Sequence, residues 1–299
     1  MIDGRRKPDV VLLPSHFNTT SEIPTAWTDI LLTCEVKYKD TGQLLKLAEH
    51  QLQDHAYFIL SSQIDRELVM GFTLCGAFLR LYLFSRNGQF KSAPIDVHSQ
   101  PTLLVKLIAM STYGDPSWLG YDPAYNKSLS KVQVRFQGKW YCVLAVLFHS
   151  KGLKGRGTRV MLVQGIDEED YMPFVLKDTY HNPDWATDGE IHQLLEDPDR
   201  FGFEREDPSL APDGGRAGIP VFIAEETTPL ALLESWARVL CPSSSSKEPK
   251  KHLRIAFQTC SVGIAWFSCV REFLDAFIGA MEGEIKSFYD LLQRSNIFM

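Results

Sequence analysis

Cysteine and histidine chemistry is sparse in this sequence. The six cysteines are scattered and no two of them form a CxxC pair, and the eight histidines form no cluster with ligand spacing. Neither a zinc framework nor a disulfide scaffold is therefore expected. Without disulfides, the chain fits a reducing compartment better than an oxidising one.

An excess of basic residues and long apolar runs are also missing. The formal net charge is -6, whereas a generic nucleic-acid binder is usually basic, so nucleic acid is not the expected partner. The apolar run VVLL at residues 10–13 is too short for the core of a signal peptide. No stretch is long and free of charge enough to span a bilayer. The sequence thus predicts an intracellular protein, cytoplasmic or nuclear, with no membrane partner.

The length of 299 residues and the 44% hydrophobic content predict two globular domains. The first is expected over residues 1–125 and the second over residues 131–299. Apolar periodicity in the first part predicts the following elements: a buried strand in PDVVLL, a strand in WTDILLTCEVKYK, a helix from Leu44, a hairpin with Gly76 near its middle and a second turn at Asn87–Gly88, and a helix in PTLLVKLIAMSTYG.

Strands that follow one another through short turns predict an antiparallel sheet in the second part. VQVRFQGKWYCVLAVLFH, RVMLVQG, YMPFVLKD, IPVFIAEE and LRIAFQ are its expected strands. A helix is expected in DGEIHQLLED with Asp188 as its N-cap, and another at the end of the chain. Residues 197–218 and 241–252 are predicted to be insertions, since the first is rich in Asp, Glu, Pro and Gly and the second is a Ser/Lys tract of low complexity. The whole is therefore an α+β protein.

A glycine-rich turn lies between two of these strands, in GLKGRGTRVMLV. Gly155, Gly157 and Val160 give the pattern GxGxxV, and Gly152 lies just upstream. Glycines let the backbone approach phosphate oxygens and offer N–H donors to them. A plain turn is the alternative, because one glycine-rich hairpin has little specificity.

Two charged residues follow the glycine turn in a meaningful order. Lys177 ends the third apolar run, where its ammonium group can meet phosphate as a point charge. Glu190 comes next, on the predicted helix, where it can pair with Lys177 and hold it in place. Glycine loop, strand lysine and helix glutamate follow one another in this way in the protein-kinase N-lobe. A solvated lysine and a charge that favours a helix N-terminus are the alternatives for Lys177 and Glu190.

The chain resembles the fungal-type protein kinases over nearly its whole length. The resemblance is carried by RRKPDVVLL, WTDILLTCEVK, QIDRELVMGFTLCGAFLRLYLFSRNG, PIDVH, LGYDP, GLKGRGTRV, VLKDTY and GEIHQLL. It implies an accessory domain followed by a serine/threonine kinase N-lobe, with ATP and Mg²⁺ as cofactors. In that family's terms, Gly152, Gly155, Gly157 and Val160 line the ATP phosphates. Lys177 contacts them, Glu190 orients Lys177, and residues 259–263 form the hinge to adenine.

One departure from the family pattern limits what the resemblance implies. Family members continue into a catalytic loop with an HRD-type aspartate and then a DFG-type aspartate, which supply the base and hold magnesium. The sequence contains neither tripeptide, and SNIFM stands about where that loop would begin. The expectation is a catalytically inactive or incomplete kinase with only the first helices of a C-lobe. Its last helix is expected to present apolar residues to the missing C-lobe or to a protein partner.

The first part carries a second pattern of reactive residues. Asp9 opens one strand and Glu35-x-Lys37 closes the next, which resembles the core of PD-(D/E)XK nucleases. There, the carboxylates corresponding to Asp9 and Glu35 hold a divalent cation and the lysine positions water. Gln53 and Tyr57 are similar to the QxxxY element of related nucleases, one helical turn apart on a face expected toward Lys37.

Three hypotheses about function follow from these patterns. The first is a fungal-type kinase whose catalytic half is missing, and the second is a non-catalytic, pseudokinase-like module that binds a protein partner or nucleotide. The third is a magnesium-dependent nuclease that uses the first domain. An inactive relative of the nuclease fold remains an alternative for that domain, since Asp9 and the Glu35/Lys37 pair also suit an exposed strand face.

Overall fold

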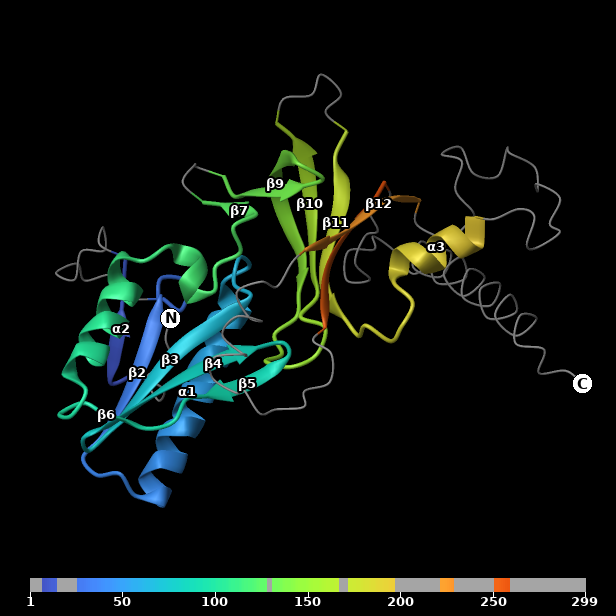
Figure 1. Ribbon diagram of the computed structural model, residues 1–299. Helices are drawn as coiled ribbons and strands as arrows, with labels where there is room; N and C mark the ends of the chain where they lie inside the picture. Colours follow the sequence, from blue (N-terminus) through green and yellow to red (C-terminus); the bar gives the residue numbers. More distant parts are fainter. Residues whose placement is uncertain are drawn as a thin grey trace, which may run out of the picture.

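The computed structural model describes residues 7–14, 26–127, 131–166, 172–196, 221–228 and 250–258. These residues form two β-sheets that lie side by side along the molecule (Figure 1). No helix among them is both long and apolar enough to cross a membrane. The expected last helix, the hinge at residues 259–263, the 197–218 insertion and most of the 241–252 tract lie outside the described residues.

The first sheet has the order β1-β2-β3-β4-β5, and β6 pairs with β4. Its only parallel pair among the described strands is β2 with β3, which α1 connects. The elements of this part are β1 (Val10–Leu12), β2 (Leu32–Lys37), α1 (Gly42–Ser62), β3 (Leu68–Cys75), β4 (Phe78–Ser85), β5 (Gly88–Lys91), β6 (Ile95–Asp96), α2 (Pro101–Tyr113) and the 3-10 helix η1 (Pro116–Leu119).

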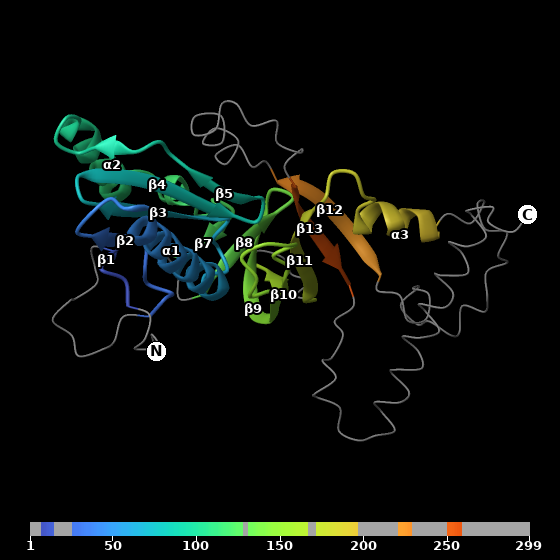
Figure 2. The same ribbon diagram turned by 90° about the horizontal axis from the view of Figure 1, so that it is seen from below.

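Alternation along β3 and β4 explains why helices cover both faces of the first sheet. Val69 and Tyr82 pack with Leu52 and Ile59 of α1, whereas Met70, Leu81 and their neighbours pack with Leu107 of α2. Successive residues of a strand point to opposite faces, so a run that is apolar on both faces needs two covers. Figure 2 shows the sheet between α2 and α1.

The first strand differs from the sequence prediction. PDVVLL was expected to be a buried strand, but β1 lies at the edge of the sheet and pairs only with β2 among the described strands. Val10 is 53% exposed as a result. An apolar run alone does not separate an edge strand from a central one, because pairing on the second side is set by the rest of the sheet.

The second sheet has the order β12-β13-β11-β10-β9-β8-β7, and each neighbouring pair of these strands is antiparallel, as the sequence predicted. The turn between β8 and β9 is Gln137–Gly138, where both residues have positive φ. The elements are β7 (Tyr125–Asn126), β8 (Gln133–Phe136), β9 (Lys139–His149), β10 (Arg159–Gly165), β11 (Phe174–His181), α3 (Asp188–Glu196), β12 (Phe222–Thr228) and β13 (Lys251–Phe257).

The two faces of the second sheet have separate apolar cores. One core contains Met161, Leu176 and Ala256, and the other contains Val175 and Ile255. Since Leu176 and Val175 are neighbours in β11, side-chain alternation also assigns the next two residues, Lys177 and Asp178, to opposite faces. This alternation positions the groups described below.

Candidate functional site

The glycine loop connects β9 to β10, as predicted. Gly155 and Gly157 have φ values of 106° and 53°, which L side chains rarely adopt. No atom lies within 4 Å of the place that a Cβ on Gly155 would occupy. Among the described residues, no backbone N–H of residues 152–157 donates a hydrogen bond. The loop thus combines open space at Gly155 with backbone donors that have no partner among the described residues, which are features that suit a bound anion.

The first sheet braces this loop from one side. Lys250 donates from Nζ to the carbonyl oxygens of Gly155 (2.9 Å) and Arg86 (3.0 Å). A Cβ on Gly157 would lie 2.5 Å from Nε of Arg86, and Leu153 packs against the α1 side of the first sheet. The position of the glycine loop is therefore fixed partly by residues of the first sheet.

Lys177 lies on β11 opposite Val160 of β10, directly after the glycine loop. Its Nζ forms an ion pair with Oδ2 of Asp188, the first residue of α3. The two side chains are 23% and 25% exposed, so a ligand can reach them. Lys177 is thus presented by a rigid strand and is held by an acid of the following helix.

The acid that holds Lys177 is not the one predicted. Glu190 was expected in that role, but its Oε2 accepts a hydrogen bond from the backbone N–H of Thr187 (2.8 Å). The Thr187 hydroxyl in turn accepts one from the N–H of Glu190 (3.1 Å). This reciprocal pair is a capping box, so Thr187 rather than Asp188 is the N-cap. Because Thr187 caps the helix, the Asp188 carboxylate is left to pair with Lys177.

A continuous row of side chains crosses the Lys177 face of the sheet. The strand register places Phe148, Val160, Lys177, Ile255 and Glu225 next to one another. Glu225 accepts a hydrogen bond from the N–H of Gly189 (3.0 Å), which ties the start of α3 to this face. Lys177 therefore lies between apolar neighbours, beside a helix N-terminus whose position is fixed.

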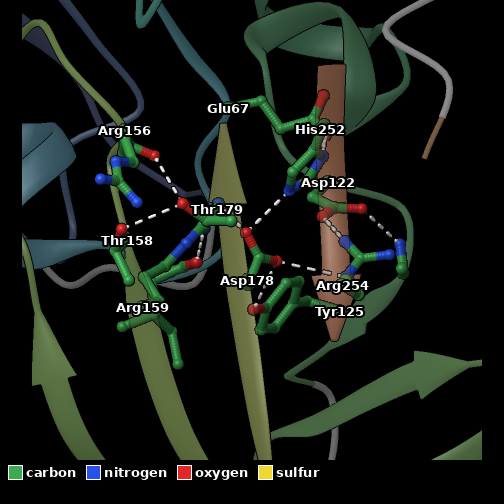
Figure 3. A network of polar contacts seen from close by, with 12 residues as sticks. Glu67, Asp122, Tyr125, Arg156, Thr158, Arg159, Asp178, Thr179, His252 and Arg254 are labelled. Carbon is green, nitrogen blue, oxygen red and sulfur yellow. Dashed lines mark hydrogen bonds and ion pairs between the residues drawn. The ribbon is translucent and has the colours of Figure 1, made fainter. Parts of the chain in front are cut away.

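The opposite face carries a buried row of charges (Figure 3). Arg159, Asp178, Arg254 and Glu226 are adjacent in the strand register, so positive and negative groups alternate. Asp178 lies 3.0 Å from Arg159, 3.2 Å from Arg254 and 2.7 Å from Nε2 of His252. Burial alone would raise the pKa of Asp178, but Arg159 and His252 hold it well below its usual value.

This buried row also joins the two sheets. His252 lies 3.0 Å from Glu67, which directly precedes β3. Arg254 pairs with Asp122, which follows η1, and Arg159 donates to the carbonyl oxygen of Ile64. Burial would lower the pKa of His252, but Asp178 and Glu67 raise it to about 9. The first sheet is therefore attached to the second on the face opposite Lys177.

The structure brings three nuclease-like residues of the first domain together. Nζ of Lys37 lies 3.3 Å from Asp9 and 3.0 Å from Glu35, and His55 of α1 lies 3.6 Å from Glu35. Burial raises the pKa of Glu35 despite its hydrogen bond from Lys37. Burial would raise the pKa of Asp9, but the hydrogen bonds from Val36 N–H and Lys37 together lower it. A buried carboxylate with a lysine and a histidine is thus present in this domain.

The other two predicted residues lie elsewhere. Gln53 donates to Gln89 of β5 (2.8 Å), and the Tyr57 ring packs on Phe58. On α1, His55 rather than Gln53 or Tyr57 faces Glu35, because the buried side of the helix contains Leu52, His55, Ala56 and Ile59. The expectation that Gln53 and Tyr57 face Lys37 was therefore wrong.

Comparison with known proteins assigns the family. A family profile described as fungal protein kinase matches residues 7–202, which is more than half of the chain. The chain therefore belongs to the fungal protein kinase family, as its motifs predicted. No curated protein and no solved structure matches it.

Sequence reasoning missed the buried charge row entirely. His252 and Arg254 alternate with Leu253 and Ile255 in β13, a pattern that normally indicates a solvated strand face. Here that face is covered by the first sheet, so both residues are almost completely buried. The sequence does contain the capping-box pattern, as Thr187-x-x-Glu190 before an apolar run. This signal could have shown that Glu190 is a capping residue and not the partner of Lys177.

Proposed function

We propose that this chain binds the phosphates of ATP on the Lys177 face of the second sheet and acts as the nucleotide-anchoring part of a serine/threonine-type kinase. The single observation that carries the proposal is the Lys177–Asp188 ion pair, whose lysine lies opposite Val160 on the strand that follows the glycine loop. A strand lysine held by an acid of the next helix is the arrangement that kinases use to position the α- and β-phosphates.

Each part of this face has a chemical role in the proposal. The free N–H groups around Gly155 and Gly157 would donate to phosphate oxygens, and the ammonium group of Lys177 would neutralise their charge. Val160 and Ile255 flank Lys177 in the register and would exclude water on either side. Magnesium would be held mainly by the phosphates themselves, as is usual for this ion.

Phosphoryl transfer is not proposed for these residues by themselves. A kinase needs an aspartate that accepts the substrate proton and carboxamide or carboxylate groups that hold magnesium. The sequence contains neither an HRD nor a DFG tripeptide. We therefore propose nucleotide binding without turnover for this sequence, which leaves the phosphate acceptor of any complete enzyme unassigned.

Titration with a fluorescent ATP analogue in the presence of magnesium tests the proposal. Loss of a charge-assisted hydrogen bond costs about 1.5–3 kcal/mol, so Lys177→Ala should weaken binding by roughly 10- to 150-fold. Lys251→Ala is the matched control, because Lys251 is an exposed lysine of the adjacent strand β13. Equal affinities of the wild type and Lys177→Ala would remove Lys177 from the site and end the proposal.

A second candidate function rests on the convergence of Asp9, Glu35 and Lys37. A carboxylate pair with a lysine can hold a divalent cation and position water for attack on a phosphodiester. In this candidate, a magnesium ion would compete with Lys37 for the space between the two carboxylates. Incubation of single- and double-stranded DNA and RNA with the protein and Mg²⁺ tests it. Cleavage that Glu35→Gln abolishes would support it, and intact substrates would reject it.

A further inference from the structure

A group of possible metal ligands lies where the two sheets meet. Glu67, Asp122 and His252 come from three distant parts of the chain, and one ligand atom of each lies within 4.8 Å of the others. Asp122 and His252 are 1% and 0% exposed. Figure 3 shows the three side chains on the buried face, near Asp178 and Arg254. Three such atoms in one small buried volume are the number of protein ligands that an open zinc site uses.

The orientation of the His252 ring points to a ligand. Its Nε2 lies 2.7 Å from Asp178 Oδ1, which leaves Nδ1 directed at Glu67 Oε1 at 3.0 Å. Neither of these last two atoms has a hydrogen-bond partner of acceptable geometry, although both are buried. Buried polar atoms are normally satisfied. These two atoms meet as an ion pair whose hydrogen bond is poorly aligned, and a metal ion in place of the ring proton would satisfy both.

The separation of His252 Nδ1 and Glu67 Oε1 fits a zinc ion, and the ligand atom of Asp122 lies within 4.8 Å of both. Ligands at about 2.0–2.1 Å from a tetrahedral Zn²⁺ lie roughly 3.3 Å apart, which is close to the separation of His252 Nδ1 and Glu67 Oε1. Metal-bound histidines usually donate their other ring N–H to a carboxylate, which fixes the tautomer. Asp178 occupies that outer position. A nitrogen ligand together with carboxylates favours zinc over magnesium or calcium, which prefer oxygen.

The charges around the cluster leave room for a divalent ion. Within the described residues, the ion pairs of this network involve four carboxylates: Glu67, Asp122, Asp178 and Glu226. They involve only two guanidinium groups, those of Arg159 and Arg254. His252 carries a proton in its ion pairs with Asp178 and Glu67, so one negative charge of the network is uncompensated. A divalent cation in place of the His252 proton would leave the network neutral. Arg254 pairs with Asp122, so this ligand would be shared between the ion and the guanidinium group.

We propose that Glu67, Asp122 and His252 form a zinc site that fastens the first sheet to the second, with Asp178 as the outer carboxylate behind His252. This inference goes beyond the proposed nucleotide binding and does not depend on it. The site lies on the face opposite Lys177. It differs from the expectation, drawn from the lack of ligand-spaced histidines, that the chain has no structural metal site. The proposed ligands are separated by 55 and 130 positions in the sequence, so spacing could not suggest them.

Metal content and affinity of the purified full chain test the site. The protein is stripped with a chelator, and its binding of Zn²⁺ alone is then measured by competition with a chromophoric chelator, while elemental analysis gives the stoichiometry. We expect one equivalent of zinc and at least a tenfold preference over Mg²⁺. Glu67→Gln and His252→Asn should each weaken zinc binding by more than roughly 100-fold, since loss of an outer residue alone already costs about 10- to 100-fold.

The matched control is Asp65→Asn. Asp65 is a carboxylate of the same interface, but it pairs with Lys127 and is not in the cluster; this variant should bind zinc like the wild type. Circular dichroism shows which variants are folded. If His252→Asn is unfolded, Glu67→Gln, whose side chain is partly exposed, still tests the site. No stoichiometric zinc in the folded wild type would overturn the proposal. So would unchanged affinity in folded Glu67→Gln, which would indicate that cysteines or other residues bind the metal.

Discussion

Two adjacent residues of β11, Lys177 and Asp178, illustrate how differently the two faces of the second sheet are built. The ammonium group of Lys177 is partly exposed and has one acidic partner, Asp188. The Asp178 carboxylate is fully buried and contacts Arg159, His252 and Arg254. One face is open to a ligand, and the other is closed by the first sheet. Because side chains alternate along a strand, one short segment contributes to both faces. Substitutions in it can therefore change one face without the other.

The largest effect is expected from Asp178→Asn. Removal of one partner from a buried ionic network costs about 3–5 kcal/mol, because the remaining charges stay buried without compensation. The free energy of unfolding should fall by that amount in chemical denaturation. Glu226→Gln is the control, since Glu226 is 27% exposed and contacts Arg254 only at 3.6 Å. A loss below 1 kcal/mol for Asp178→Asn would mean that the buried face does not hold the sheets together.

The next effect concerns the glycine loop, where the two sheets also touch. At Gly157, alanine would face both a positive φ of 53° and the Arg86 side chain at 2.5 Å. At Gly138 it would face a positive φ of 79° but no atom within 4 Å. Left-handed backbone costs about 1–2 kcal/mol and overpacking about 1–3 kcal/mol more. Gly157→Ala should therefore destabilise the protein by about 2–5 kcal/mol and Gly138→Ala by about 1–2 kcal/mol in thermal unfolding. Equal losses would show that the first sheet does not brace the loop.

Acid should weaken the buried face through His149, which lies opposite Arg159 in the strand register. Burial, with Arg159 and Arg86 nearby, lowers the pKa of His149 to about 4. The unfolded chain, with a histidine pKa near 6.5, therefore binds more protons than the folded one below pH 6.5. Stability is then fully present above pH 6.5 and is lost as the pH falls toward 4. Because His149 is partly exposed, we discount this loss for solvent screening to about 1–2 kcal/mol.

Comparison of the wild type with His149→Gln isolates this contribution. The difference between their unfolding free energies should change between pH 6.5 and 4 and stay constant above pH 7. Asp178 does not interfere, since its pKa is held well below 3.8. A difference that is the same at every pH would contradict the assignment of a neutral, buried His149.

The smallest effect is expected at the cap of α3. Thr187→Ala removes the side-chain half of the capping box, which costs about 1 kcal/mol. Since α3 carries Asp188, nucleotide binding should weaken slightly while the contacts between the sheets stay intact. Thr227→Ala, at an exposed position of β12, is the control for threonine loss in a calorimetric scan. No stability change in Thr187→Ala would indicate that Asp188 rather than Thr187 caps the helix.

The sequence was most informative where local pattern decides structure. The periodicity from Leu44 predicted α1, and the turn at Gln137–Gly138 separated β8 from β9 as expected. Gly155 and Lys177 could be placed on a glycine turn and the following strand, because these depend on neighbours in the chain. The partner of Lys177 could not be predicted in this way. Asp188 and Glu190 both lie in the first turn of α3, and the capping box decides which of them is free to pair with Lys177.

Long-range contacts were beyond sequence reasoning. Glu67, Asp122 and His252 look like three unrelated polar residues until the fold brings them within 4.8 Å. The face of α1 toward Glu35 was also mistaken, because Gln53 and Tyr57 matched a short signature whereas the helix phase is set by its apolar residues Leu52, Ala56 and Ile59. Polar residues on a buried face carry no periodic signal that separates them from a solvated face.

Hydrogen exchange of the full chain, with and without MgATP, tests the central claim most directly. If the Lys177 face binds nucleotide, amides of residues 150–160 and 187–191 should exchange more slowly when MgATP is present. Amides of residues 65–68 and 121–125, which lie at the junction of the sheets, should be unchanged. Unchanged exchange in residues 150–160 and 187–191 at saturating MgATP, or slowing only at the junction, would contradict the account.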